Sequence, residues 1–350
     1  MKGGGEAAGA RWSGLRLSVT LLTVIPWPSA GPAPPLAPAT AAAAMAWAPA
    51  VGVLLGVSGA VVLLVADHPL GAGPLTGAGL AIASLALLSR GLHLDGLADL
   101  ADGLGSGKPA PAALDIMRRS DIGPLGTVTL VLTLIIQVAA LSHAESAGHG
   151  RGPAALIAAV VAGRLAITWA CRRGVPAARR EGLGALVAGT VRPVIPAVTT
   201  LVTLSAAIAA VMISATVTGG PPGWTLPLAV AAGLVVASGL ERHAVRRLGG
   251  ITGDVLGALA EVTTTVTLVV AAMGPRALPQ RAQARAVTSG SARPSARRCS
   301  PAQGRRRPPS AYAQGTSSPS GRRASGSSGR PGAGSAGSPP WRAGLRRSRS

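Results

Sequence analysis

An acidic stretch near the end of the first third of the chain holds the side chains best suited to chemistry. Five of the twelve acidic residues fall within it, namely Asp95, Asp99, Asp102, Asp115 and Asp121. The first three stand at positions i, i+4 and i+7, and in a helix this spacing places them on one face. Because unpaired carboxylates on one face repel each other, the pattern predicts a cation held among them.

The available ligands indicate which cation this is. Oxygen donors with no cysteine and few histidines favour Mg²⁺ over zinc, and Mg²⁺ bound by a few carboxylates commonly takes phosphate oxygens as further ligands. We therefore expect Asp95, Asp99 and Asp102 to hold Mg²⁺ beside a phosphorylated substrate.

Two plainer interpretations of this stretch stay open. The acids could form a solvated loop that is salt-bridged to Lys108, Arg118 and Arg119. His93, which precedes them, could be a hydrogen-bonded packing residue at a membrane interface instead of a catalytic group.

Basic residues and glycines in three further segments predict contacts to phosphate groups. Guanidinium groups near a helix N-terminus bind anions, and positive charge beside flexible backbone suits a phosphate or nucleotide cradle. The candidate substrate-binding residues are Arg118, Arg119, Ser120, Arg179, Gly182, Gly184, Gly250, Thr252, Gly253 and Asp254. The alternatives are that the two arginines at 118 and 119 are membrane anchors and that Asp254 is a helix N-cap.

The elements that position these residues are expected to be membrane-spanning helices. The 350 residues are 48% apolar and contain no Phe, and apolar runs of about 17 or more residues recur, each long enough to cross roughly 30 Å of hydrocarbon. Candidate spans lie at 47–66, 75–90, 124–142, 153–170, 194–217, 225–240 and 255–273. The sequence therefore predicts an all-α fold, a polytopic transmembrane helical bundle of about seven spans.

Two segments before these spans have a different character. The run from 15 to 25 is short and ends in Pro26-Trp27-Pro28, so it suits an interfacial or re-entrant helix. Residues 29–44 are rich in Pro and Ala and are expected to form a linker.

The basic residues predict how the bundle is oriented. Loops 91–122, 171–193 and 241–254 carry eleven Lys and Arg, whereas the alternating loops 67–74, 143–152 and 218–224 carry Arg151 alone. Since short basic loops stay in the cytoplasm, the three polar loops are expected there. The active site would then face the cytoplasm of a bacterial inner membrane that the chain crosses several times.

The net charge of +21 is mostly a property of the C-terminal tail. Residues 276–350 hold 16 of the 33 Lys and Arg and none of the 12 acids. Their Ser, Pro, Gly and Arg content predicts a disordered tail after an integral membrane catalytic domain at 1–275. The lipid bilayer is the expected partner of that domain, and no nucleic acid is expected.

The ordered motifs closely resemble those of the cobalamin synthase family, adenosylcobinamide-GDP ribazoletransferase. The family signature, Gly-Leu-His-Leu-Asp-Gly-Leu-Ala-Asp followed by Ala-Asp-Gly, matches positions 91–103 almost throughout. Further similarity lies at 23–28, 47–56, 116–126, 181–184 and 248–258 with Glu261, so the likeness spans roughly residues 12–273. The run Arg119-Ser120-Asp121 departs from the family, whose members often show Asp-Ser-Arg, and the tail lies beyond the family's usual end.

The resemblance implies a Mg²⁺-dependent membrane transferase in the last assembly stage of coenzyme B12 biosynthesis. Such an enzyme joins alpha-ribazole, or its 5′-phosphate, to adenosylcobinamide-GDP, and the products are adenosylcobalamin, or its 5′-phosphate, and GMP. For this reaction Asp95, Asp99 and Asp102 would hold Mg²⁺. The ribazole hydroxyl proton would pass to His93 or to one of the aspartates, of which Asp95 is the candidate.

Two other functions are compatible with parts of the sequence. A divalent-cation transporter could use the same carboxylates as permeation ligands, but transport sites usually lie near the bilayer midplane at broken helices. These acids are instead expected in a Gly-rich cytoplasmic loop beside arginines, which would repel a permeating cation. A phosphatidyl-alcohol phosphotransferase is suggested by Asp95-Gly96 followed by Ala98, although its longer paired-aspartate pattern is missing.

Overall fold

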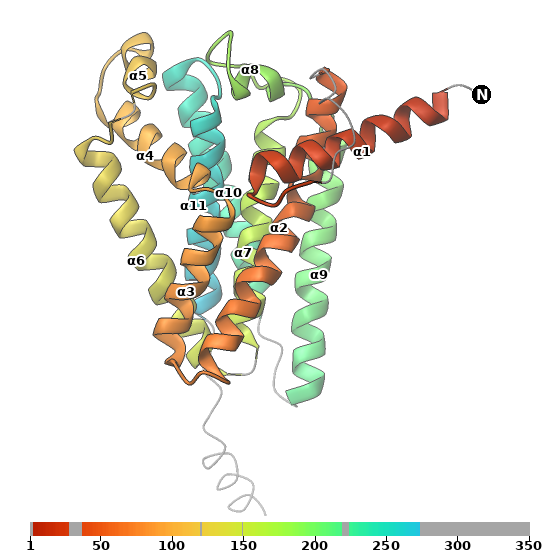
Figure 1. The fold of residues 1–350 in the computed structure, drawn as a ribbon, viewed down its shortest axis with the longest axis vertical. Coiled ribbons are helices and arrows are strands. Elements are labelled where there is room, and N and C mark those ends of the chain that lie inside the picture. Colours follow the sequence, from red (N-terminus) through yellow and green to blue (C-terminus); the bar gives the residue numbers. More distant parts are fainter. Residues whose placement is uncertain (1–2, 28–36, 120, 149, 219–223, 274–350) are drawn as a thin grey trace, which may run out of the picture. The chain divides into compact units, whose positions relative to one another are not determined.

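The regular secondary structure is helical throughout the part of the chain that the structure, a computed structural model, describes. That part comprises residues 3–27, 37–119, 121–148, 150–218 and 224–273 (Figure 1). Its helices are α1 (Gly3–Leu22), α2 (Pro38–Asp67), α3 (Gly73–Leu88), α4 (Leu92–Gly105), α5 (Ala110–Ile116), α6 (Pro124–Ser146), α7 (Arg151–Ala170), α8 (Leu183–Val187), α9 (Val194–Thr218), α10 (Thr225–Leu248) and α11 (Gly253–Ala272).

The predicted membrane-spanning bundle is confirmed. Six helices, namely α2, α6, α7, α9, α10 and α11, are long and apolar enough to cross a membrane. The pair α3 and α4 meets the same criterion jointly, but the two helices are bent by 88° at the break between them. The described chain therefore offers six spans, or seven if this bent pair counts as one, in agreement with the seven expected apolar runs.

Two predictions about segments outside the spans were wrong. The Pro/Ala segment 29–44 is not a linker along its whole length, because α2 begins at Pro38; residues 28–36 lie outside the described part. A proline at the first helical position followed by an alanine run favours a helix start. The polar segment 91–122 is not one loop but contains α4 and α5.

The bend between α3 and α4 is built from two residues in the left-handed region. Arg90 has φ 55° and Gly91 has φ 67°, so the helix cannot continue through them. The end of α1 supports this corner: the Val24 amide donates to the Leu88 carbonyl at 2.7 Å, and the Arg90 guanidinium donates to the Thr23 carbonyl at 3.1 Å. The corner turns α4 away from the direction of α3.

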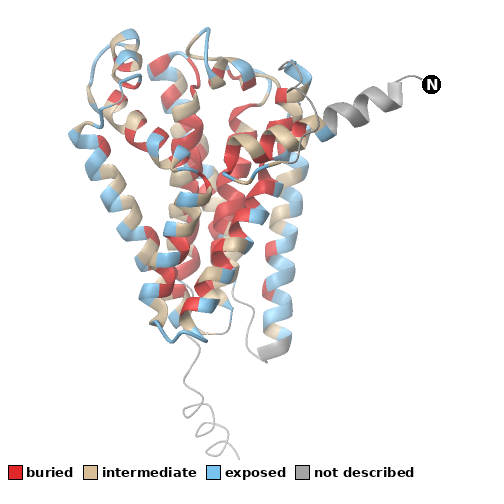
Figure 2. Cartoon of the chain, viewed as in Figure 1, coloured by how far each residue is buried: buried red, intermediate tan, exposed pale blue. Residues whose placement is uncertain are grey.

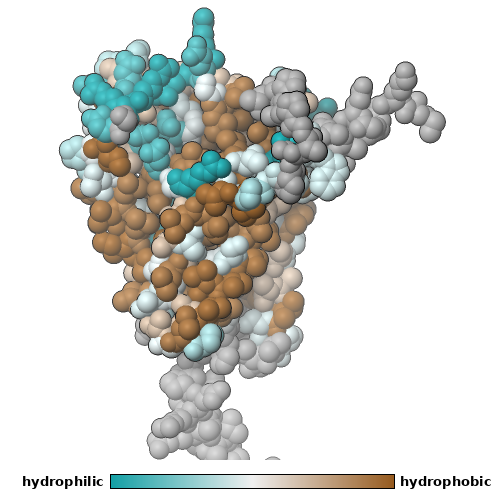
Figure 3. Space-filling model, viewed as in Figure 1, coloured by the Kyte–Doolittle hydropathy of each residue, from teal (hydrophilic) through white to brown (hydrophobic). Residues whose placement is uncertain are grey.

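The centre of the bundle is formed by α7 and α11 (Figure 2). In the 18-residue apolar stretch of each helix, 72% of the residues of α7 and 67% of those of α11 are buried. In contrast, only 17% of the corresponding stretch of α9 and 22% of that of α6 is buried. Their outward side chains, such as Leu201, Ile213 and Ile135, are large, apolar and exposed. An apolar surface this extensive fits contact with lipid. Figure 3 shows apolar side chains over the body of the bundle and polar ones gathered at the end that carries α5.

Small residues explain how a chain without Phe packs its helices. A Cβ added at Gly52 of α2 would stand 3.0 Å from Val161 Cα of α7, and one added at Gly163 of α7 would stand 2.7 Å from the Ala260 carbonyl oxygen of α11. Glycine and alanine let helix backbones approach closely, which is a common way for helices to associate in membranes. The core therefore depends on close backbone contact more than on large side chains.

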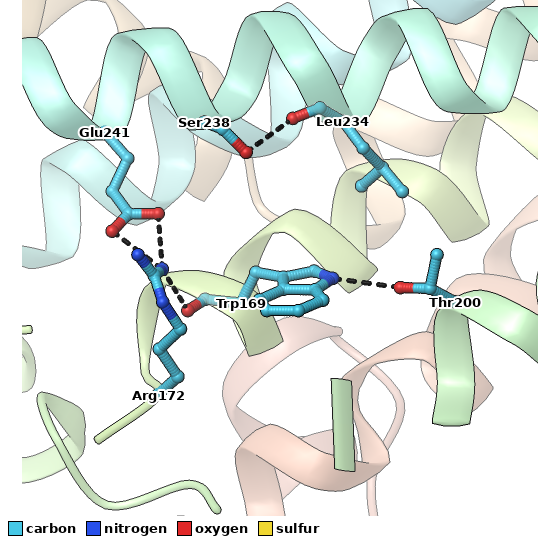
Figure 4. A network of polar contacts seen from close by, with 6 residues as sticks. All are labelled: Trp169, Arg172, Thr200, Leu234, Ser238 and Glu241. Carbon is cyan, nitrogen blue, oxygen red and sulfur yellow. Dashed lines mark hydrogen bonds and ion pairs between the residues drawn. The ribbon is translucent and has the colours of Figure 1, made fainter. Parts of the chain in front are cut away.

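A polar network joins α7, α9 and α10 near the end of α7 (Figure 4). Arg172 Nη1 lies 2.7 Å from Glu241 Oε2 and also donates to the Trp169 carbonyl at 2.8 Å. Trp169 Nε1 donates to Thr200 Oγ1 at 2.9 Å. The Glu241 side chain is 6% exposed, so the ion pair neutralises a buried carboxylate. This network fixes the base of the segment 171–193, which follows α7.

Candidate functional site

The acidic helix α4 crosses the start of α11 at two glycines. A Cβ added at Gly96 would stand 2.8 Å from the Asp254 carbonyl oxygen, and one added at Gly257 would stand 3.1 Å from His93 Cα. Neither position has room for a side chain unless the backbone shifts. The crossing therefore brings His93 and Asp95 of α4 beside Asp254 of α11, although about 160 residues separate them in the sequence.

The polar segment 171–193 is held against the same start of α11 by backbone hydrogen bonds. The Ala178 amide donates to the Ile251 carbonyl at 3.0 Å, and the Ile251 amide donates to the Pro176 carbonyl at 2.9 Å. Gly182 has φ 90° and ψ −176°, a conformation that is open to glycine alone, and it leads into the short helix α8. The second and third polar segments of the sequence thus meet at one place.

A cavity of about 230 Å³ lies where α4, the segment 171–193 and the start of α11 meet. Eight of the predicted site residues line it, namely His93, Asp95, Arg179, Gly182, Gly184, Thr252, Gly253 and Asp254. Apolar side chains from α1, α2 and α7, those of Leu21, Leu22, Met45 and Ile167, complete its wall. The cavity therefore combines carboxylates, one arginine and exposed backbone with an apolar wall.

Asp99 belongs to the same acidic patch although it does not line the cavity. Burial, and then the negative charges of Asp95, Asp254 and Asp102 in that order, raise the pKa of the Asp99 carboxyl to about 6, against the opposing effect of Arg179. The carboxylates of α4 and α11 therefore act on each other electrostatically. A group of acids this close favours a bound cation.

Asp254 is held in place by its neighbours in sequence and in space. Thr252 is the N-cap of α11: its Oγ1 accepts a hydrogen bond from the Val255 amide and donates one to Asp254 Oδ2 at 3.2 Å. Because Thr252 fills the capping position, the alternative that Asp254 is the N-cap was wrong. The Asp254 carboxylate is thus available to the cavity, with Arg179 Nη1 3.8 Å from its Oδ2.

Arg179 is also tied to α5, because its Nη2 donates to the Leu114 carbonyl at 2.6 Å. Burial lowers the pKa of the guanidinium, while the nearby charge of Asp254 opposes the change. A guanidinium keeps its charge at neutral pH even so. Arg179 therefore places a fixed positive charge at the cavity beside the carboxylates.

Asp102 is placed differently from Asp95 and Asp99. Its Oδ2 accepts a hydrogen bond from the Gly123 amide at 2.7 Å, and its Oδ1 accepts one from the Gly126 amide at 2.9 Å. These amides belong to the N-terminal end of α6, where a negative charge is stabilising. The structure thus gives Asp102 the role of an anchor between α4 and α6. Each carboxylate oxygen keeps a second lone pair, so metal binding by Asp102 stays a prediction.

His93 is 2% exposed, and among the described residues neither of its ring nitrogens has a hydrogen-bond partner. Burial lowers the pKa of the imidazole well below its ordinary value, and the charge of Arg164 adds to the effect. The ring is therefore neutral at physiological pH and can accept a proton. The alternative of a hydrogen-bonded packing histidine was wrong in one respect, since the described residues give it no hydrogen bond.

Of the remaining predicted residues, those that the structure describes do not line the cavity. Arg118 and Arg119 are exposed just after α5, and Arg118 acts electrostatically on Arg179, which places it near the site. Gly250 is buried and contacts the backbone of Ala177 and Ala178, so it serves the packing of two loops. Ser120 lies outside the described residues.

The structure also reveals a polar group inside the bundle that had not been assigned to the site. Gln137 Nε2 donates to Glu261 Oε2 and to Thr265 Oγ1, both at 2.9 Å. Arg164 is 3% exposed and interacts electrostatically with Glu261 and with His93. A charged residue inside an apolar span is the sequence signal for such a group. The apolar wall residues Leu21, Leu22 and Met45 carry no comparable signal.

Comparisons with known proteins agree with this arrangement. Residues 14–272 match the family model described as cobalamin-5-phosphate synthase. A protein of Frankia casuarinae named adenosylcobinamide-GDP ribazoletransferase is 44% identical over 267 residues, which cover 74% of this chain and 94% of the relative.

Two other proteins with the same name are similar over most of their length. That of Bradyrhizobium diazoefficiens is 36% identical over 74% of this chain and 92% of its own, and that of Syntrophobacter fumaroxidans is 35% identical over 75% and 98%. No solved structure matches the chain. With 259 consecutive residues matched by one family model, the chain belongs to the cobalamin-5-phosphate synthase family.

Proposed function

We propose that this chain is an adenosylcobinamide-GDP ribazoletransferase. It joins alpha-ribazole, or its 5′-phosphate, to adenosylcobinamide-GDP and releases GMP, which completes the assembly of adenosylcobalamin or its 5′-phosphate. The observation that carries the proposal is one cavity lined by His93, Asp95, Arg179 and Asp254, all of which lie within the residues 14–272 that match the family model. The alternative of a cation transporter has no support, because the named relatives are transferases.

The donor set of this site fits Mg²⁺. Asp95, Asp99 and Asp254 supply hard carboxylate oxygens, and burial, followed by the negative charges of the neighbouring aspartates, raises the pKa of Asp99. We propose that these three side chains hold the ion, with Asp102 contributing from its place at α6. When bound, Mg²⁺ neutralises charge on the diphosphate oxygens of the substrate.

The side chains of the cavity provide the remaining functions of a phosphoryl transfer. A ribazole hydroxyl oxygen forms a bond to one phosphorus of the diphosphate, while the bond from that phosphorus to the oxygen of GMP breaks. The neutral imidazole of His93 or the carboxylate of Asp95 accepts the hydroxyl proton. Arg179 and the backbone amides around Gly182 and Gly184 orient the phosphate oxygens, which is the main requirement of this chemistry.

The size of the cavity limits which part of the substrate it holds. Its volume of about 230 Å³ is below the range of roughly 300 to 1,000 Å³ that is typical for complete small-molecule ligands. We therefore propose that the diphosphate and the sugars next to it enter the cavity, while the corrin ring stays at its mouth. The exposed side chains of Asp95 and Glu181 lie at that mouth.

We further propose that the chain lies in a bacterial inner membrane with this cavity facing the cytoplasm. Support comes from the basic residues of the segments 171–193 and 241–254, which the positive-inside rule assigns to the cytoplasmic side.

The test is an assay on membranes from cells that express the chain. Adenosylcobinamide-GDP and alpha-ribazole are added with Mg²⁺ or with EDTA, and GMP and the corrinoid product are quantified by chromatography. The proposal expects GMP and corrinoid product in equal amounts and only with Mg²⁺. Membranes from cells without the chain are the control. Absence of both products in the presence of Mg²⁺ would contradict the proposed function.

A further inference from the structure

A second group of ligating side chains lies far from the cavity, where α2 and α6 end. Asp67 is the last residue of α2, His68 is its C-cap, and Glu145 stands one residue before the end of α6. Met45, which lines the cavity, precedes Asp67 by 22 residues on α2, or roughly 33 Å along the helix axis. This group therefore has no part in the transfer site.

The three side chains face one another without forming hydrogen bonds. One ligand atom from each lies within 4.8 Å of the other two. His68 Nε2 is 3.9 Å from Glu145 Oε1, and His68 Nδ1 is 3.8 Å from Asp67 Oδ2. Both separations are too long for hydrogen bonds. The geometry leaves space among the three groups for one small ion.

An independent observation also indicates a ligand at this place. The Glu145 side chain is only 6% exposed, and its Oε2 has no hydrogen-bond partner among the described residues. A buried carboxylate without a partner is costly. The Oε2 atom lies against Gly152 at the start of α7, where an added Cβ would overlap that oxygen. A bound cation would satisfy this carboxylate.

The helix ends and carboxylates around this group of side chains favour a bound cation. Both α2 and α6 present their C-terminal ends, where unpaired carbonyl groups give the helix its negative pole. Asp67 and His68 both act electrostatically on Glu145. Two carboxylates and two helix C-termini at one place therefore favour a bound cation.

We propose that Asp67, His68 and Glu145 bind a divalent transition-metal ion, with Zn²⁺ as the best fit, which joins the end of α2 to the end of α6. One imidazole nitrogen and two carboxylate oxygens form a ligand set that suits Zn²⁺, whereas a set made only of oxygens would suit Mg²⁺. Water completes the coordination. Ligand distances of about 2.0 to 2.2 Å require the side chains to move together by about 1 Å or less.

The experiment measures Zn²⁺ binding to the purified full chain in detergent, by competition with a chelating dye after treatment with EDTA. The wild type is expected to bind one tight equivalent of Zn²⁺. The variants Glu145→Gln and His68→Gln are expected to lose that equivalent, with affinity lowered at least 100-fold. The matched control is His243→Gln, which changes an exposed histidine near the C-terminal end of α10, outside the proposed zinc site. This variant should bind Zn²⁺ as the wild type does.

Two further variants separate this site from the transfer site and from loss of folding. Asp99→Asn should keep the tight equivalent, because it changes only the acidic patch of α4. Gly152→Ala changes none of the three ligating residues, but its Cβ pushes the Glu145 carboxylate away from its position. The affinity for Zn²⁺ is therefore expected to fall about 10-fold or more. Gly79→Ala, where an added Cβ meets nothing within 4 Å, is the control for the glycine change.

Thermal unfolding provides a readout that does not depend on the dye. Zn²⁺ should raise the Tm of the wild type and leave that of Glu145→Gln unchanged, while the two proteins without metal should unfold at similar temperatures. Co²⁺ in place of Zn²⁺ should give a visible absorption band that disappears in His68→Gln. If the wild type binds no tight Zn²⁺, or if Glu145→Gln and His68→Gln bind it as the wild type does, the proposal is wrong.

Discussion

Gly96 of α4 lies so close to Asp254 of α11 that an added Cβ would stand 2.8 Å from the Asp254 carbonyl oxygen and 2.9 Å from its Cα. This contact sets the distance between the acidic helix and the start of α11. Since both elements line the cavity, the contact links helix packing directly to the geometry of the proposed active site.

We therefore expect Gly96→Ala to lower the rate of transfer at least 10-fold, because the methyl group must push α4 and α11 apart. Displacement of reacting groups by about 1 Å is enough for a loss of this size. Gly239→Ala on α10, where an added Cβ meets nothing within 4 Å, is the control. It should retain full activity and be slightly more stable, since alanine favours a helix over glycine by up to about 1 kcal/mol. Equal activity of the two variants would contradict the packing argument.

Asp102 offers a test of anchoring against metal binding. Its two oxygens accept hydrogen bonds from the Gly123 and Gly126 amides, so Asp102→Asn keeps one acceptor and loses the other. We expect a loss of stability of about 1 to 3 kcal/mol, measured by thermal unfolding in detergent. If anchoring is the main role, the Mg²⁺ concentration needed for half-maximal activity should change less in Asp102→Asn than in Asp99→Asn. The reverse order would assign Asp102 to the metal.

His93 is expected to act on the rate of the chemical step. Because its neutral ring nitrogens have no hydrogen-bond partner among the described residues, His93→Gln should lower kcat by about 100-fold or more and leave KM nearly unchanged. His243→Gln, at an exposed histidine of α10, is the control. A variant that retains full kcat would show that Asp95 or another group takes the proton.

The ion pair of Arg172 and Glu241 should stabilise the base of the segment 171–193. Glu241→Gln leaves the Arg172 guanidinium with weaker acceptors, and Arg172→Gln leaves a carboxylate that is 6% exposed without its cation. Each single change is expected to lower the free energy of unfolding by about 2 to 4 kcal/mol, and the double change by less than the sum of the two. Additive losses in this double-mutant cycle would mean that the two side chains act independently.

Much of this arrangement could be predicted from the sequence, because its signals are local. Apolar runs predicted the spans. The spacing of Asp95, Asp99 and Asp102 showed that a helix would place these acids on one face, and α4 is such a helix, although the segment was expected to be a loop. The sequence predicted that the three polar segments share one side of the membrane, but the direct packing of α4 on the start of α11 could not be predicted. It depends on close backbone contact at Gly96 and Gly257, and glycines elsewhere in the chain have other roles.

Two further features show where local patterns are insufficient. Asp102 continues the spacing of the other acids, yet its carboxylate binds the amides of α6, a contact that depends on how the chain returns after α5. The alanine run at the start of α2 was expected to be a linker because of the prolines before it, whereas its helix propensity and the packing against α1 extend the helix to Pro38. In both cases the tertiary contact decides the outcome.

The central claim is that one cavity, formed by α4, the segment 171–193 and the start of α11, carries out the transfer. Its most direct test is the rate of GMP release by Asp95→Asn, Asp99→Asn and Asp254→Asn, with Asp121→Asn as the control at an exposed position outside the cavity. The account predicts that each of the first three loses at least 100-fold in rate at saturating substrate and that Asp121→Asn stays within about 3-fold of the wild type. Full activity of Asp254→Asn together with inactive Asp95→Asn and Asp99→Asn would contradict a site shared between α4 and α11.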